Sequence, residues 1–303
     1  MDIRPDEGRR GRDGSGENHA SVSFIEDMGG RLAIVQAHGA RAVIALQGAQ
    51  VLSFIPAGGS EVLWLSPIVR FGTGKAVRGG IPVCWPWFGP HPSDADKPAH
   101  GLVRAADWQV THWREVGNAF EIGFAIEPDV ADTNQQRVRA ELVVTVGQAL
   151  RVELSTHNLG DQPLTFSEAL HTYLRVGDIS KIEVIGLEGS AYVDQMAGRQ
   201  VLKQSGAIRF AAELDRVYID TPDTVIVRDA VRNRALYVEK AGSLSTVVWN
   251  PWIEKSQRLG DIGAEGYTRL VCVETANAEK NSVTLAPGGH HRMSLVLSAE
   301  PLR

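Results

Sequence analysis

The chain has 303 residues, of which 43% are hydrophobic and 22% are charged, and its formal net charge is −5. This balance predicts a globular protein with a sizeable apolar core, and it argues against a broad surface for nucleic acids or anionic membranes. No apolar stretch reaches the ~18 residues of a membrane span. Cys84 and Cys272 show no paired spacing, which argues against a disulfide framework and favours a cytoplasmic protein.

The first 20 residues mix arginines with aspartates and glutamates and lack an apolar segment. A signal peptide requires such a segment, and a transit peptide is poor in acidic residues. We therefore expect residues 1–20 to form a disordered tail. Residues 21–303 contain no low-complexity linker and no internal repeat, so we expect them to form a single domain.

Short apolar runs separated by turn residues begin at Arg31, as is typical of β-strands. The strands predicted first are Arg31–Ala37, Ala42–Leu46, Gln50–Ile55, Glu61–Leu65, Trp108–Trp113 and Phe120–Ile126. In the next two runs, Arg137–Val146 and Ala149–Asn158, apolar and polar residues alternate, which indicates half-buried antiparallel strands. Gly147 and Gln148 between these runs predict a hairpin turn.

Further runs of the same kind continue to the C-terminus. They are Leu164–Leu170, Tyr173–Val176, Ile182–Ile185, Thr224–Arg228, Ala235–Lys240, Ser245–Trp249, Leu270–Glu274, Ser282–Leu285 and His291–Leu297. Short helical turns are expected only near Ser66–Val69 and Trp252–Leu259. Many strands without long amphipathic helices predict an all-β protein, a large antiparallel β-sandwich, and disfavour a parallel βαβ architecture.

Chemically unusual residues are densest in Val77–Trp108, which begins VRGGIPVCWPWFG and ends PAHGLVRAADW. Its prolines exclude much regular sheet, and long irregular segments often form binding loops. Arg78 and Arg104 suit a phosphate group, and His100 lies among aromatic residues that suit a sugar ring. The alternative is that the aromatic residues fill the core and the arginines pair with surface carboxylates.

Three polar residues elsewhere are candidates for chemistry. His171 lies in a mostly apolar run and is either a core residue or a general acid, since histidine titrates nearest to neutral pH. Glu274 ends an apolar strand and is either a rim residue bonded to backbone N–H groups or a general base. Asp215, which precedes Arg216, is by itself only weak evidence for a functional site, because Asp–Arg pairs are common on loops. The histidines show no metal-ligand spacing, so we expect no metal and no cofactor.

Taken together, these segments resemble the hexose-6-phosphate mutarotases, also called glucose-6-phosphate 1-epimerases, of the aldose 1-epimerase superfamily. The matching pieces, in the family's order, are VRGGIPVCWPWFG (77–89), PAHGLVRAADW (98–108), ALHTYLRVGDI (169–179), LDRVY (214–218), VVWNPWIEKS (247–256) and VCVE (271–274). The resemblance extends from about Ile34 to Leu297. It implies a large antiparallel β supersandwich with few short helices, in agreement with the strand pattern.

The resemblance also implies an activity, the interconversion of the α and β anomers of a hexose 6-phosphate, whose chemistry requires no cofactor. We expect the protein to be a cytoplasmic monomer that binds a small-molecule hexose phosphate and no nucleic acid or membrane. By position, His171 matches the family's catalytic acid and Glu274 its catalytic base. The positions that match substrate-binding residues are Arg78, His100, Arg104 and Asp215. One departure is Ala99, where some members have glutamine, and this difference bears on sugar preference more than on chemistry.

The sequence is also compatible with three alternative functions. A non-catalytic sugar-phosphate sensor could share the fold, but it would not need both His171 and Glu274. A mutarotase for unphosphorylated hexoses is disfavoured by Arg78 together with Arg104. A metal-dependent sugar isomerase of the cupin type would require clustered histidine and glutamate ligands on neighbouring strands, and the sequence lacks that pattern.

Overall fold

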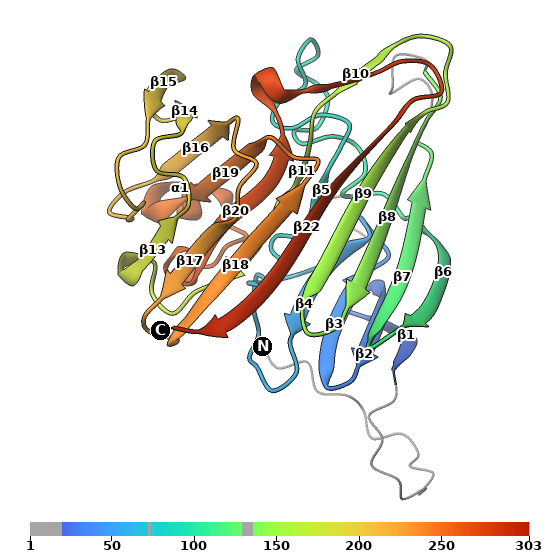
Figure 1. The fold of residues 1–303 in the computed structure, drawn as a ribbon, viewed down its shortest axis with the longest axis horizontal. Coiled ribbons are helices and arrows are strands. Elements are labelled where there is room, and N and C mark those ends of the chain that lie inside the picture. The colour runs from blue at the N-terminus through green and yellow to red at the C-terminus, as the bar shows by residue number, and fades with distance from the viewer. Residues whose placement is uncertain (1–19, 72–73, 75, 129–135, 303) are drawn as a thin grey trace, which may run out of the picture.

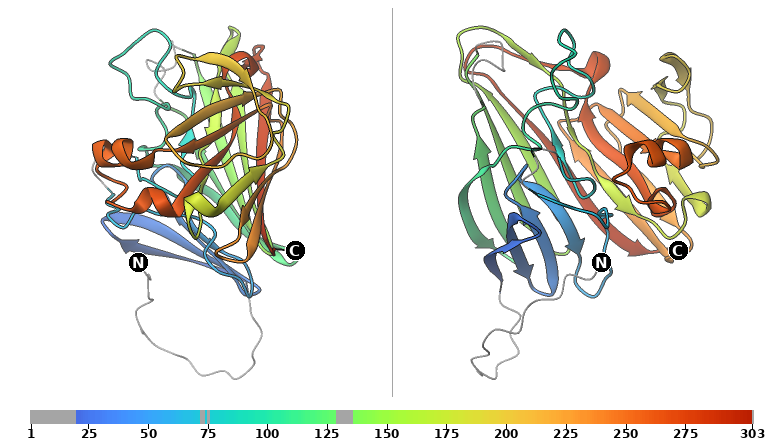
Figure 2. Two further views of the ribbon diagram at one scale, coloured as in Figure 1. Left: turned by 90° about the vertical axis from the view of Figure 1, so that its left-hand side faces the viewer. Right: turned by 180° about the vertical axis from the view of Figure 1, so that it is seen from behind.

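The structure is a computed structural model that describes residues 20–71, 74, 76–128 and 136–302. The chain folds into antiparallel sheets that pack face to face (Figures 1 and 2). This arrangement confirms the predicted all-β sandwich. The tail expected at residues 1–20 lies, except for its last residue, outside the described residues.

One eight-stranded sheet, here called sheet I, has the order β15-β14-β16-β19-β20-β11-β5, and β12 also pairs with β20. Its strands are β5 (Val83–Cys84), β11 (Glu168–Leu170), β12 (Tyr173–Arg175), β14 (Ala191–Asp194), β15 (Gln200–Lys203), β16 (Leu214–Ile219), β19 (Ser245–Asn250) and β20 (Leu270–Asn277). All its pairings are antiparallel. β11 and β12 are consecutive short strands, and both lie along β20.

A second eight-stranded sheet, sheet II, has the order β13-β17-β18-β22-β9-β8-β7-β6. Its strands are β6 (Gln109–Val116), β7 (Ala119–Ile126), β8 (Val138–Val146), β9 (Leu150–Asn158), β13 (Ile182–Ile185), β17 (Val225–Asp229), β18 (Arg234–Ala241) and β22 (His290–Pro301). The predicted hairpin is confirmed, because Val146 of β8 pairs with Leu150 of β9.

The N-terminal strands form a separate four-stranded sheet, and two short strands pair at one end of the molecule. These strands are β1 (Ser21–Asp27), β2 (Gly30–Ala37), β3 (Ala40–Ala45), β4 (Gln50–Ile55), β10 (Leu164–Phe166) and β21 (Val283–Leu285). The helical elements are α1 (Trp252–Leu259), η2 (Ile179–Lys181), η3 (Gly266–Arg269) and η4 (Glu279–Asn281). Across the part of the chain that the structure describes, no helix has the length and hydropathy of a membrane span.

Two elements predicted from the sequence, both within residues 61–69, are wrong. Residues 66–69 form a turn rather than a helix, because the Ser66 hydroxyl accepts a hydrogen bond from the Ile68 N–H group at 3.2 Å. The predicted strand Glu61–Leu65 is reduced to isolated bridges at Leu63 and Leu65. The short helix predicted at residues 252–259 is confirmed as α1.

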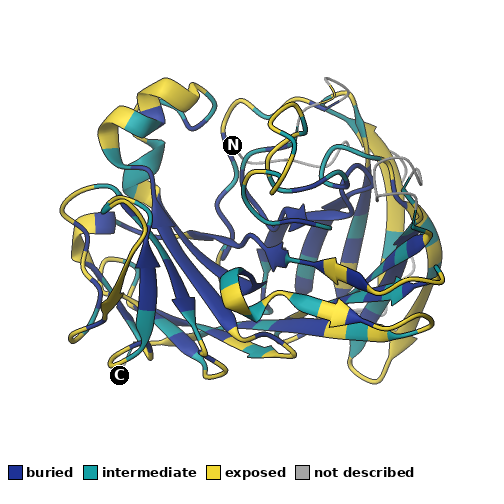
Figure 3. Cartoon of the chain, turned by 90° about the horizontal axis from the view of Figure 1, so that it is seen from above, coloured by how far each residue is buried: buried dark blue, intermediate teal, exposed yellow. Residues whose placement is uncertain are grey.

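The core is formed by alternate side chains of the facing sheets. Trp85, Phe54 and Phe124 are among the largest fully buried side chains, and burying such residues supplies about 1.5–3 kcal/mol each relative to exposure. Every residue of β20 is buried, which means that both faces of this strand are covered. Figure 3 shows the buried strands at the centre of the molecule and the exposed residues mainly at the loops around them.

Candidate active site

His171 and Glu274 meet at the middle of sheet I. Leu170 of β11 pairs with Thr275 and Tyr173 of β12 pairs with Cys272, so the two residues between these short strands lie beside Glu274 on β20. As a result, His171 Nε2 lies 3.3 Å from Glu274 Oε1. His171 is 7% exposed and Glu274 is 1% exposed. These two side chains, far apart in sequence, therefore form a contact shielded from water.

Burial moves the pKa values of this pair in opposite directions. It raises the pKa of Glu274 well above its usual range; nearby Asp215 raises it further, and Arg104 opposes the shift. Burial lowers the pKa of His171 well below its usual range, and His100, Arg104 and Arg78 lower it further. Both shifts have the same physical cause, because burial penalises the charged form of each group.

The segment 78–104 covers one face of this pair. The His100 ring lies 5.7 Å from the His171 ring, and its Nδ1 accepts a hydrogen bond from the Gly89 N–H group at 3.3 Å. Burial lowers the pKa of His100 to about 3, with Arg104 and Arg78 adding to the shift. His100 is therefore neutral at ordinary pH and offers a hydrogen bond rather than a charge.

A glycine is required where this segment turns back on itself. Gly101 has a φ of 84°, and a Cβ at this position would lie 2.0 Å from the Trp85 carbonyl oxygen. The close approach allows Leu102 N–H to donate to that same oxygen at 2.9 Å. This hydrogen bond fixes the loop that carries His100 and Arg104. Within the same loop, Arg104 Nη2 donates to the Ala99 carbonyl at 2.8 Å.

Arg78 is held at the other end of the segment. Its Nε donates to Asp261 Oδ2 and its Nη1 donates to the Tyr173 hydroxyl, both at 3.0 Å. Burial by itself would lower the pKa of Arg78, but Tyr173 and Asp261 outweigh it, and the pKa is raised. The Tyr173 ring in turn stacks on the His171 ring, with centroids 4.7 Å apart. Arg78 thus stays charged and is connected to the acid–base pair through one aromatic ring.

Asp215 is positioned by a lysine that the sequence predictions did not include. Lys255 on α1 places its Nζ 3.5 Å from Asp215 Oδ2 and 2.7 Å from Glu213 Oε1. The same ammonium lies 5.7 Å from the centre of the Trp249 ring. Burial raises the pKa of Asp215, and Lys255 opposes the shift. Lys255 therefore favours the ionised form of Asp215.

The structure thus brings the predicted site residues toward one region of sheet I and adds Tyr173, Trp249, Lys255 and Asp261 to them. Tyr173, Trp249 and Lys255 lie in segments that carry the family resemblance, which is a usable signal. Asp261 lies outside those segments and is separated from Arg78 by 183 residues. Only the fold brings these two together.

One group among the described residues has the donor atoms of a metal site. The imidazole of His171, the thiol of Cys272 and the carboxylate of Glu274 lie within 4.8 Å of one another, and these are donor types that zinc binds. His171 and Glu274 already contact each other through one nitrogen and one oxygen. This direct contact fits a proton-transferring pair better than an open metal site.

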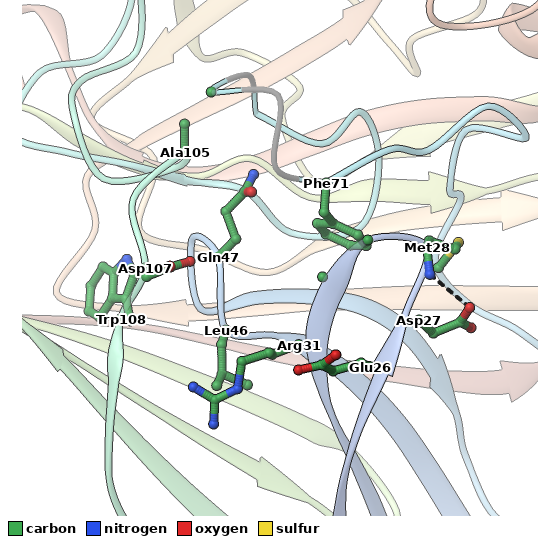
Figure 4. A pocket seen from close by; sticks show the side chains of 13 residues that line it. Glu26, Asp27, Met28, Arg31, Leu46, Gln47, Phe71, Ala105, Asp107 and Trp108 are labelled. Atoms are coloured by element: carbon green, nitrogen blue, oxygen red, sulfur yellow. Dashed lines mark hydrogen bonds between the residues drawn. The ribbon is translucent and has the colours of Figure 1, made fainter.

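A cavity of about 710 Å³ lies elsewhere, between the N-terminal sheet and residues 105–108 (Figure 4). Its polar side chains are mixed in charge: Glu26, Asp27, Arg31, Gln47 and Asp107. None of the predicted site residues lines it. The acid–base pair and this cavity are therefore separate features of the molecule.

Chemically, the described site can move one proton on and one proton off a bound molecule. Its two titratable groups are buried and in contact, two arginines supply positive charge, and Asp215 with His100 can bind hydroxyl groups. Aromatic faces such as that of Trp249 suit the C–H faces of a sugar ring. The site is thus typical of acid–base chemistry on a polyhydroxylated, anionic small molecule.

Known proteins show the same combination of fold and sequence. A protein of Escherichia coli K12 named "Putative glucose-6-phosphate 1-epimerase" is 38% identical over 261 residues, which cover 84% of this chain and 86% of that protein. A protein of the same name from Cenchrus ciliaris is 34% identical over 273 residues, which cover 86% of this chain and 82% of that one.

Solved structures of mutarotases and mutarotase-like proteins share the fold of this chain. A crystal structure from Salmonella typhimurium, described as a "putative mutarotase", has a TM-score of 0.86 at 31% identity and covers 92% of this chain and 94% of its own. A galactose mutarotase-like protein from Clostridium acetobutylicum, at 14% identity and a TM-score of 0.72, shares the fold over 93% of this chain and 99% of its own. The family model for aldose 1-epimerase matches residues 31–298. The chain therefore belongs to the aldose 1-epimerase family and is an isomerase.

Proposed function

We propose that this chain interconverts the α and β anomers of a hexose 6-phosphate, and that glucose 6-phosphate is its substrate. The observation that carries this proposal is the buried contact of 3.3 Å between His171 Nε2 and Glu274 Oε1. The substrate is supported by the names of the bacterial and plant relatives and by two arginines beside the pair.

Mutarotation opens the hemiacetal ring, turns the C1 carbonyl and closes the ring again. In the opening step, ionised Glu274 takes the proton of the C1 hydroxyl while protonated His171 donates its proton to the ring oxygen. The C1–O5 single bond breaks, and the open-chain aldehyde forms with its C=O double bond between C1 and O1 and a hydroxyl group at O5. After rotation about C1–C2, neutral His171 takes the O5 proton and Glu274 returns its proton to O1 as the ring closes. Each proton lost is regained, so no cofactor enters the balance.

Burial of the pair serves this proton exchange. Lowering the pKa of His171 and raising that of Glu274 removes the ordinary preference for the ion pair over the neutral pair, so the proton can move between the two groups. Proton transfer is most efficient when the donor and acceptor are matched in this way. A positioned acid or base of this kind contributes about 10²–10⁴-fold to the rate.

The other site residues orient the sugar. Arg78 and Arg104 bind the 6-phosphate, for which a guanidinium group supplies charge-assisted hydrogen bonds. Asp215, held by Lys255, accepts hydrogen bonds from sugar hydroxyl groups, and neutral His100 adds another polar contact. Binding the remote phosphate fixes C1 beside the acid–base pair and lowers the entropic barrier to reaction.

We further propose that the protein acts as a monomer in the cytoplasm. The proposed site residues all come from one chain, and Cys84 and Cys272 are free and buried, as suits a reducing compartment. A light-scattering mass close to 32.9 kDa in solution would agree with a monomer, whereas twice that mass would contradict it.

Exchange NMR on the anomeric protons tests the activity. Spectra of glucose 6-phosphate are recorded with and without catalytic amounts of protein in a buffer free of phosphate, with glucose run in parallel. We expect strong acceleration of exchange for the ester and weaker acceleration for glucose. Equal acceleration of both sugars would overturn the substrate assignment, and exchange at the background rate would favour a sugar-phosphate sensor.

A further inference from the structure

Four arginines gather where β12, β20 and the β17–β18 turn meet. They are Arg175, Arg232, Arg234 and Arg269. Arg234 Nη2 donates to the Arg175 carbonyl at 2.6 Å, and Arg269 Nη1 donates to the Gly177 carbonyl. Asp229 links the two halves of the group, because its carboxylate accepts from the N–H groups of Gly177 and Arg232. We call these four side chains the arginine cluster.

The arginine cluster has no ion pair. Among the described residues, no carboxylate oxygen lies within 4.0 Å of a guanidinium nitrogen of these four arginines, which is the distance that defines a salt bridge. The nearby acids have other partners: Asp229 and Glu61 accept from backbone N–H groups. Asp178 accepts from the Ser180 N–H group and pairs with Lys181 at 3.9 Å. Elsewhere in the molecule exposed arginines do pair, as Arg199 does with Glu279.

Some of the donors in the cluster lack any partner. The Nε atoms of Arg232 and Arg234 are buried and make no hydrogen bond, and Arg234 is 7% exposed. Burial and the charge of Arg232 lower the pKa of Arg234 to about 10. Burial and the charges of Arg175 and Arg269 lower the pKa of Arg232. Unsatisfied, mutually repelling cations of this kind are costly, and an anion between them would relieve both penalties.

A cavity adjoins the cluster and gives a ligand room. Arg175 and Arg269 line it, together with Arg41, Thr268 and the two acids Glu61 and Glu265, and its volume is about 580 Å³. Trp64 also lines it and stacks on the ring of Tyr173, with centroids 5.9 Å apart. This aromatic pair forms a wall between the cavity and the acid–base site, so the two sites are distinct.

We propose that the arginine cluster is a second anion site, at which Arg175, Arg232 and Arg269 bind a phosphate group. Guanidinium forks match the oxygens of a phosphate group in geometry and stay charged at all ordinary pH values. The phosphate group is either inorganic phosphate or part of a small phosphate ester. This proposal does not depend on the function of the acid–base site.

The test is a titration of the ¹⁵N-labelled full chain with inorganic phosphate at fixed ionic strength. The Nε–H signal of Arg232 is identified by its absence in Arg232→Ala, and those of Arg78 and Arg104 in the same way. We expect the Arg232 signal to shift and saturate. In Arg175→Ala the affinity reported by this signal should fall about tenfold, as expected for loss of a charge-assisted hydrogen bond.

A matched control removes an arginine that already has a partner. Arg151→Ala removes the same charge from a surface ion pair with Glu153 and should leave the affinity unchanged. A linear shift of the Arg232 signal, saturation only of the Arg78 and Arg104 signals, or an equal effect of Arg175→Ala and Arg151→Ala would each overturn the proposal. A repeat with glucose 6-phosphate identifies the source, because tighter binding than inorganic phosphate assigns the site to an ester and equal or weaker binding assigns it to the free ion.

Discussion

Strands β20 and β8 each belong to an eight-stranded antiparallel sheet, but they differ in what covers them. All eight residues of β20 are buried, whereas in β8 buried residues alternate with half-buried ones. One face of β20 packs in the main core through Val271 and Val273. On its other face, Leu270 and Cys272 pack in a second cluster with Trp64, Tyr173, Trp249 and Ile262. Polar side chains on β8 reach water, and those on β20 do not.

The same residue type has different properties on these two strands. Glu141 on β8 pairs with Arg139 at 2.9 Å, and its side chain is 39% exposed, so the pair adds at most about 1 kcal/mol to stability. Glu274 on β20 is buried against His171, and its pKa is strongly raised. Coverage of the second face thus separates a surface glutamate from one that suits acid–base chemistry.

The largest expected effect comes from removing a member of the pair. Glu274→Gln and His171→Asn should each lower kcat by about 10²–10⁴-fold, because each removes one proton-transferring group while keeping a similar shape. Anomer exchange at saturating glucose 6-phosphate measures the change. Glu141→Gln is the matched control on β8 and should leave kcat unchanged; a comparable loss in that control would remove the distinction between the two strands.

A smaller effect is expected at the phosphate. Arg78→Ala should lower kcat/KM for glucose 6-phosphate by about 10–100-fold, since a charge-assisted hydrogen bond contributes about 1.5–3 kcal/mol. The loss for glucose should be several times smaller, because glucose has no phosphate group. Arg139→Ala on sheet II serves as the control. Equal losses for the two sugars would show that Arg78 supports the site through Tyr173 and Asp261 rather than through the phosphate.

Replacing Lys255 on α1 tests whether this residue positions Asp215 of sheet I without taking part in proton transfer. Lys255→Ala should raise KM by up to about tenfold with little change in kcat, because it loosens Asp215 without touching the proton-transferring pair. Lys255→Arg should restore most of the affinity. The exposed Lys280, which pairs with Asp220, provides the control Lys280→Ala. A fall in kcat at unchanged KM would contradict a positioning role.

The smallest change is expected in the pH profile of kcat. The active pair carries one proton in total, so activity falls when both groups are protonated and when neither is. The lowered pKa of His171 sets the acid limit and the raised pKa of Glu274 sets the alkaline limit, which predicts an acid limit below the ordinary histidine range and an alkaline limit above the ordinary glutamate range. Glucose, without a titrating phosphate, is the control substrate. A midpoint near 6.5 for both sugars would indicate an unshifted histidine.

Strand prediction from the sequence succeeded where one face of a strand meets water. The alternating runs at β8 and β9 were placed to within about a residue, since alternation encodes a half-buried strand. β15 was missed because all four of its residues are exposed and it lacks an apolar face. β1 and β14 were also missed, and β1 is mostly exposed as well.

Site prediction depended on the resemblance to a family rather than on local pattern. By itself, a buried strand such as β20 offers no alternation that would separate Glu274 from a core residue. The contacts of Arg78 with Asp261 and of Lys255 with Asp215 join residues far apart in the chain, and no spacing rule predicts them. The arginine cluster was invisible for the same reason, since its members are spread from residue 175 to residue 269.

The most direct test of the acid–base pair is a comparison of Glu274→Gln, His171→Asn and the double variant by anomer exchange on glucose 6-phosphate. If the two groups work as one unit, the double variant is no less active than the less active of the two single variants. If the losses multiply, or if either single variant keeps the parent rate, the two residues do not share the proton transfer and the pair is not the centre of the reaction.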